Sequence, residues 1–174
     1  MKAMKKVLVS ALAAALVVTA AAPAGAATYP VTAPKAANGK ATVKGVSVKY
    51  AKNGTATITA VKSKKATVKV AATIKVKGVT YKVTAIGANA FKNCKKVKKI
   101  SVGKNVKTIG KNAFKGCKKL KTITLANKKV TIKKGAFAGL NTKKITIKAP
   151  KMSKKALKKF KKALKKAGFK GKVK

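Results

Sequence analysis

The chain has 174 residues, of which 46 are basic and none is Asp, Glu or His; every basic residue is Lys. No salt bridge between side chains can form, and carboxylate, Ser-His-Asp and hard-metal chemistries lack their residues, so we expect no enzyme activity, metal or cofactor. Apolar residues make up 47% of the chain and are clustered, which predicts a small folded domain rather than charged disorder.

Residues 1–26 have the parts of a secretory signal peptide. A lysine-bearing start is followed by an apolar stretch over residues 7–22 and by Ala-Gly-Ala at 24–26. We predict cleavage after Ala26, hence a secreted protein; the alternative is a membrane anchor. Residues 27–40, with Pro30 and Pro34, are expected to form a linker.

Residues 41–81 alternate apolar residues with Lys or Thr, as half-buried strands do. Turn signals stand at Asn53-Gly54 and at Gly78. The pattern predicts short antiparallel strands that form an N-terminal β-rich cap.

Residues 82–150 contain an internal repeat. Two copies align almost residue for residue, over 83–105 and 106–128, and a degenerate third follows over 130–150. The period is about 23 residues, which lies in the leucine-rich-repeat range. Three apolar columns follow this period: Ile86, Ile109 and Ile132; Phe91, Phe114 and Phe137; Cys94, Cys117 and Leu140.

Each repeat is expected to form one coil with one strand. Strand alternation points apolar pairs inward, and Lys99 and Lys144 outward on a common face. The inward pairs are Ile100 and Val102, Ile123 and Leu125, and Ile145 and Ile147.

Residues 151–174 predict a C-terminal helical cap and basic tail. Ser153 can cap a helix that ends near Gly168. Eight lysines would line one helix face, and their repulsion predicts that the helix is stable only when docked. The expected apolar stripe consists of Ala156, Leu157, Phe160, Ala163, Leu164 and Ala167.

The repeats resemble the BspA-type leucine-rich repeats of bacterial surface proteins. The pattern I-G-x-x-A-F-x-x-C-x-x-[LV]-x-x-I-x-[LV] spans residues 86–102 and 109–125. The resemblance implies a β-rich leucine-rich-repeat solenoid, here with three short coils between the two caps. It also implies a secreted or non-covalently surface-associated bacterial protein that serves adhesion or ligand binding.

Cys94 and Cys117 occupy one column of adjacent coils, within disulfide range. We interpret them as buried thiols, with a structural disulfide as the alternative. Two thiols alone do not complete a zinc site.

Lysines of a single sign attract polyanions and repel like chains, so we expect a monomer that binds anionic polymers. Cell-wall teichoic acid, anionic glycans and extracellular DNA are the expected partners. No sequence-specific nucleic-acid motif is present, and Arg is missing. The alternatives are a membrane-active protein whose C-terminal helix lies on anionic bilayers, and a generic structural or interaction module. The candidate binding residues are Lys99, Lys104, Lys128, Lys144, Lys148, Lys158, Lys159, Lys162 and Lys166.

Overall fold

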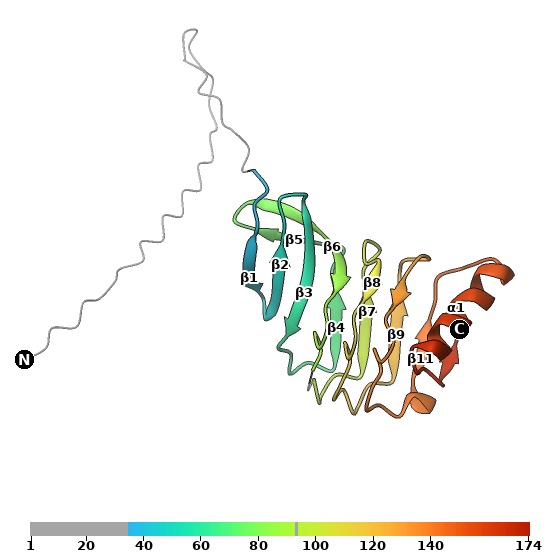
Figure 1. Ribbon diagram of the computed structural model, residues 1–174. Helices are drawn as coiled ribbons and strands as arrows, with labels where there is room; N and C mark the ends of the chain where they lie inside the picture. Colours follow the sequence, from blue (N-terminus) through green and yellow to red (C-terminus); the bar gives the residue numbers. More distant parts are fainter. Residues whose placement is uncertain (1–34, 93) are drawn as a thin grey trace, which may run out of the picture. The chain divides into compact units, whose positions relative to one another are not determined.

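The computed structural model describes residues 35–92 and 94–174 (Figure 1). The predicted signal peptide, residues 1–26, and most of the predicted linker lie outside the described residues. The described part contains two sheets and one α-helix (Figure 1).

The first sheet has seven strands, in the order β1-β2-β3-β6-β8-β10, with β5 paired to β6. Its strands are β1 (Gly39–Val43), β2 (Val46–Tyr50), β3 (Thr55–Val61), β5 (Thr73–Val76), β6 (Val79–Ile86), β8 (Thr108–Ile109) and β10 (Thr131–Ile132). The pairs β1–β2, β2–β3 and β5–β6 are antiparallel, as expected of the N-terminal cap. However, β3 runs parallel to β6, which in turn is parallel to β8.

The predicted linker extends too far along the chain. Strand β1 begins at Gly39, because Gly39 and Lys40 pair with Tyr50 and Lys49 of β2. The backbone of the expected linker therefore already contributes to the sheet at these two positions.

The second sheet is entirely parallel, in the order β12-β11-β9-β7-β4. Its strands are β4 (Thr67–Val70), β7 (Lys99–Val102), β9 (Thr122–Leu125), β11 (Thr146–Lys148) and β12 (Lys172–Val173). Matching inward residues stand side by side across its first four strands, at Val68, Ile100, Ile123 and Ile147.

The expectation of three coils is wrong by one, because β3 and β4 form an additional coil before the recognised repeats. Ile58 of β3 pairs with Ile86, and Val68 of β4 pairs with Ile100. The segment that joins Ile58 of β3 to Val68 of β4 is shorter than the corresponding segment between β6 and β7. The β5–β6 hairpin is also inserted after β4. The residues of the extra coil therefore do not lie one repeat period before the residues with which they pair. A fixed sequence period therefore misses it. Assigning β4 to an antiparallel cap is corrected by the same observation.

A column of phenylalanines fills the space between the two sheets. The ring centroids of Phe91 and Phe114 lie 5.6 Å apart, as do those of Phe114 and Phe137. All three side chains are buried, and so are Ile86, Ile109 and Ile132. Offset aromatic pairs at such distances stabilise by about 0.5–1.5 kcal/mol beyond their buried area. The predicted columns are thus the core of the solenoid.

The loops beside this column need residues that tolerate a left-handed backbone. Asn89 and Asn112 have φ values of 57° and 54°, and Gly135 follows at 74°. These three positions recur with the same period as the apolar columns. Asn and Gly are the residue types that adopt this conformation at least cost, so the repeat specifies its turn as well as its core.

The helix α1 (Lys154–Lys166) follows a short 3₁₀ helix, η1 (Thr142–Lys144), and strand β11. Ser153 caps it by accepting a hydrogen bond from the Ala156 N–H. Beyond its end, Gly168 has a φ of 87°, and the Phe169 N–H donates to the Leu164 carbonyl. This is the Schellman arrangement, which requires a left-handed residue just past the helix.

The apolar face of α1 is narrower than predicted. Phe160, Leu164 and Ala167 are buried and Leu157 is half-buried, whereas Ala156 and Ala163 are exposed. An alanine at the edge of a stripe has too short a side chain to reach the solenoid. The expected basic tail is partly ordered as β12, which pairs with β11.

Candidate polyanion-binding surface

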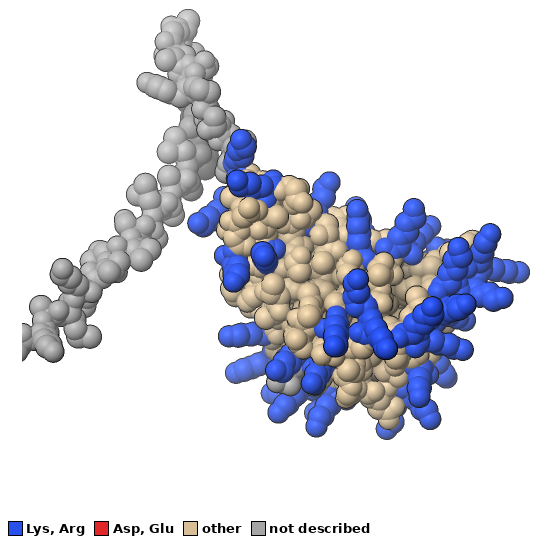
Figure 2. All heavy atoms as spheres, in the orientation of Figure 1, with Lys and Arg blue, Asp and Glu red and all other residues tan. Residues whose placement is uncertain are grey.

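Every lysine of the described residues is exposed. Figure 2 shows their side chains projecting around the visible face of the molecule, with no acidic residue among them. Because the chain has no carboxylate side chain, no acidic side chain of the protein neutralises this positive charge. The positions of the lysines on the fold therefore decide how a bound anion is contacted.

The outward face of the second sheet has the most regular arrangement. Strand alternation places two outward residues on most strands, and the parallel register aligns them into two rows across the sheet. The first row consists of Thr67, Lys99, Thr122, Thr146 and Lys172. The second row consists of Lys69, Ser101, Thr124 and Lys148.

In each row, two hydroxyl residues lie between two lysines. Lys99 and Lys172 are separated by Thr122 and Thr146, and Lys69 and Lys148 by Ser101 and Thr124. With neighbouring strands about 4.8 Å apart, each pair of lysine backbones spans roughly 14 Å. We call the residues of the two rows together the strand face. It can offer ammonium groups at both ends of a run of hydroxyl donors and acceptors.

Two of the predicted lysines lie on the strand face, Lys99 and Lys148. Lys144 does not, although a strand position was expected for it. It lies in η1, because the third repeat carries one extra residue before its strand, so that Thr146 rather than Ile145 pairs with Thr122.

The remaining predicted lysines lie elsewhere. Lys104 is in the turn after β7 and Lys128 in the bend after β9. Each stands next to an asparagine whose side-chain amide holds the neighbouring coil: Asn105 donates to the Ala72 carbonyl at 3.0 Å, and Asn127 to the Val106 carbonyl at 2.9 Å. The helix lysines Lys158, Lys159, Lys162 and Lys166 are exposed on α1.

Sequence reasoning missed Lys69 and Lys172. Lys69 was assigned to the antiparallel cap and Lys172 to a basic tail, yet both lie on parallel strands of the second sheet. A signal for Lys69 is present, since the sequence Thr-Val-Lys-Val at 67–70 has the alternation of the repeat strands. Nothing comparable marks Lys172, whose strand is too short to show alternation.

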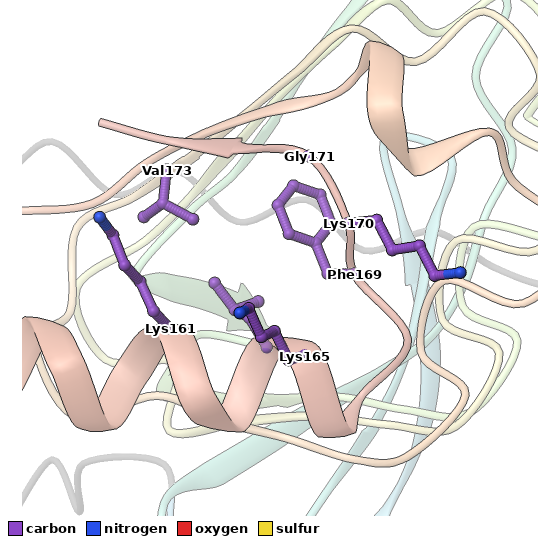
Figure 3. A pocket seen from close by; sticks show the side chains of 7 residues that line it. Lys161, Lys165, Phe169, Lys170, Gly171 and Val173 are labelled. Carbon is purple, nitrogen blue, oxygen red and sulfur yellow. The ribbon is translucent and has the colours of Figure 1, made fainter.

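A pocket of about 490 Å³ lies between α1 and the segment that follows it. Leu164, Phe169 and Val173 contribute apolar surface, and Lys161 and Lys165 come from the helix (Figure 3). Lys170 extends to the other side of Phe169, away from Lys161 (Figure 3). Lysine side chains thus border the apolar lining of this pocket.

The two cysteines are free thiols, as interpreted from the sequence, and the alternative disulfide is absent. The Cys94 thiol donates to the Val61 carbonyl at 3.2 Å, and the Cys117 thiol to the Phe91 carbonyl at 3.1 Å. Burial raises the pKa of Cys117 to about 12 and raises that of Cys94 as well. Protonated thiols of this kind are poor nucleophiles and serve packing here. Leu140, which continues their column, is half-buried.

Within residues 35–92 and 94–174, no group of three or more Cys, His, Asp or Glu residues could hold a metal ion. No helix in this part of the chain has the length and apolar character that a bilayer crossing requires.

Solved structures similar to this chain include two leucine-rich repeat proteins. A leucine rich cell surface protein from Faecalibacterium prausnitzii A2-165 is 27% identical, with a TM-score of 0.52 over 63% of this chain and 32% of the other. The chain thus spans about a third of that protein's length. A leucine-rich repeat protein from Bacteroides capillosus ATCC 29799 is 23% identical, with a TM-score of 0.58 over 78% of this chain and 98% of the other, and shows the fold alone. None of the curated proteins matches.

The family model described as BspA type Leucine rich repeat region (6 copies) matches residues 80–174, which is more than half of the chain. Its match begins at β6 and includes the β7–β11 coils, α1 and β12. The chain belongs to the family of BspA type leucine rich repeat regions.

Proposed function

We propose that this protein is a secreted, non-enzymatic binding module that holds anionic polymers at a bacterial cell surface. One observation carries the proposal: a parallel sheet presents lysine and hydroxyl side chains in two registered rows on a chain that has no acidic residue. The similarity to a leucine rich cell surface protein supports the location.

The mechanism is multivalent contact. A flexible anionic polymer laid across the strands meets Lys99 and Lys172 in one row and Lys69 and Lys148 in the other. Each ammonium releases a counterion from the polymer, and the hydroxyls between them hydrogen-bond to its oxygen atoms. Lysine acts as a point charge without a preferred contact plane, so the rows favour regularly spaced anions over any base sequence.

The membrane-active alternative has less support. It needs the apolar face of α1 to enter a bilayer, yet Phe160 and Leu164 are buried in the solenoid. The helix would have to undock before it could insert. Its lysines, in contrast, are free to contact a polymer while it stays docked.

The test compares two variants of the full chain with equal loss of charge. The strand-face variant is Lys69→Gln, Lys99→Gln, Lys148→Gln and Lys172→Gln. The control variant is Lys158→Gln, Lys159→Gln, Lys162→Gln and Lys166→Gln on α1. Binding to lipoteichoic acid, heparin, sialylated mucin and duplex DNA is measured as a function of salt.

We expect the strand-face variant to lose more affinity for at least one polymer than the control does. For DNA, log K falls as log salt rises, and each lost phosphate contact makes this negative slope less steep by about 0.9. Equal losses for the two variants on every polymer would show that only net charge matters and would contradict the proposed face.

A further inference from the structure

We propose that the N-terminal end of the solenoid contains a binding site for a long-chain anionic amphiphile, with a fatty-acid carboxylate as the occupant. The site is a pocket of about 600 Å³ between the two sheets. It borders the strand face, with which it shares Thr67 and Lys69, but its ligand differs from the polymers proposed above.

The pocket exists because the two sheets have unequal width. The second sheet ends at β4, whereas the first continues past β3 to β2 and β1. The inward residues of this overhang therefore have no strand of the second sheet opposite them, although Val48 and Tyr50 of β2 are buried, Tyr50 with its ring 4.8 Å from that of Tyr81. At the other end of the solenoid, Leu164 and Phe169 cover the last coil and are 1% and 2% exposed. Among the described residues, large apolar side chains thus close the C-terminal end, whereas Val43, Val46 and Ile74 at the N-terminal end are half-buried.

The walls of the pocket are apolar. Ile58, Val61 and Val83 come from the first sheet, and Val68 and Val70 from the second. Val43, Val46 and Ile74 lie at its opening and are half-buried, although side chains of this kind are usually covered in a core. A volume of about 600 Å³ falls within the range of ligand pockets, roughly 300–1,000 Å³.

The rim of the pocket is cationic. Five lysines line it, Lys44, Lys62, Lys64, Lys65 and Lys69, and all are exposed. The rim is partly fixed in place, because the Lys62 N–H donates to the Gly45 carbonyl at 2.8 Å and the Lys65 N–H to the Ser63 hydroxyl at 3.2 Å. The first of these bonds joins the β1–β2 turn to the loop between β3 and β4, and the second orders that loop.

Apolar walls with a cationic rim favour an anion that carries an acyl chain. A second copy of this chain is disfavoured, because it would bring more lysines to the lysine rim. A hydrophilic polyanion would leave the walls unfilled. A fatty acid places its carboxylate at the rim and its chain between the sheets, where each buried methylene strengthens binding by about fourfold.

The probe is dodecanoate, titrated calorimetrically into the full chain below its micelle concentration. We expect one site per chain, with octanoate bound more weakly by roughly fourfold for each missing methylene. Dodecanol and dodecylammonium have the same chain without the negative charge and are expected to bind more weakly than dodecanoate. Equal binding of dodecanol and dodecanoate would overturn the role of the lysine rim.

Two variants locate the site. Ala71→Trp places a large side chain at an exposed residue that lines the pocket, and we expect it to weaken dodecanoate binding at least tenfold, with circular dichroism confirming the fold. Lys64→Gln with Lys65→Gln is expected to weaken it about tenfold. The control, Lys154→Gln with Lys155→Gln, removes the same charge from exposed positions of α1 and is expected to leave dodecanoate binding unchanged.

A diazirine-bearing dodecanoate then reports the location directly. Crosslinks are expected within residues 43–74 and at Val83. Crosslinks confined to residues 161–173 would place the ligand in the pocket beside α1 and overturn the assignment. Absence of binding would also overturn it, including the case in which the chain's own residues 1–34 fill the pocket. Sedimentation that shows a ligand-independent dimer blocked by Ala71→Trp would assign the pocket to a second copy instead.

Discussion

The ring of Phe169 packs against the ring of Phe137, with 5.1 Å between their centroids. Phe169 thereby adds a fourth ring to the phenylalanine column, although it lies well over one repeat period after Phe137 in the sequence. The chain reaches this place by passing through the whole of α1 and its Schellman turn. The C-terminal cap is therefore a continuation of the core.

Replacement of Phe169 is predicted to destabilise the domain. Phe169 is 2% exposed, so Phe169→Ala is expected to lower the free energy of unfolding by about 3–5 kcal/mol. Phe169→Leu retains most of the volume and is expected to cost about 1 kcal/mol. Urea unfolding monitored by circular dichroism measures both. A loss below about 1 kcal/mol for the alanine variant would mean that the cap contributes little to the core.

Gly171 is predicted to tolerate no side chain. A Cβ at this position would overlap the carbonyl oxygens of Thr142 and Ile145. Gly171→Ala is therefore expected to cost about 3 kcal/mol and to displace β12. Gly54→Ala is the comparison, since a Cβ there meets no atom within 4 Å and only its φ of 73° is unfavourable, at about 1 kcal/mol. Similar unfolding energies for the two variants would contradict the predicted clash.

The buried thiols predict a loss of stability in alkali. Burial raises the pKa of Cys117 from 9.0 to about 12. A thiol whose pKa is higher in the folded state contributes stability that is fully present below pH 9 and is lost as the pH rises toward 12. The slope approaches about 1.4 kcal/mol per pH unit for one group.

Lysine side chains also lose their charge at alkaline pH, which relieves the repulsion between them and changes the stability independently of Cys117. The effect of Cys117 is therefore measured as a difference between two proteins that have the same lysines. Unfolding energies of the natural chain and of Cys117→Ala are compared from pH 8 to pH 11. We expect the gap between them to narrow as the pH rises. A constant gap would show that Cys117 ionises as readily in the folded state as in the unfolded one.

Stability in acid is predicted to be almost flat. Acid unfolding usually results from protonation of carboxylates and histidines, and this chain has no Asp, Glu or His. We expect the free energy of unfolding to change by less than about 1 kcal/mol between pH 7 and pH 3 at constant ionic strength. Thermal or urea unfolding at these two pH values measures it. A steep loss of unfolding free energy in this range would contradict the prediction, because it would require a titrating group other than an Asp, Glu or His side chain.

Several features could be predicted from the sequence because they repeat locally. The repeat period identified the columns that begin at Ile86, Phe91 and Cys94, and the structure buries all of their members except Leu140, which is half-buried. Ser153 and Gly168 marked the ends of α1, since capping depends on residues close in sequence. The composition alone showed that the chain carries an uncompensated positive charge.

Other features depended on pairings between distant residues, and only the tertiary structure decided them. Lys69 joined the strand face because β4 pairs with β7, which follows only after the β5–β6 hairpin, and Lys144 left it because one extra residue shifts β11. The pocket between β1–β3 and β4 arises from the unequal width of two sheets. A period in the sequence reports repeats of equal length, whereas strand register follows hydrogen bonds between strands and accommodates coils of unequal length.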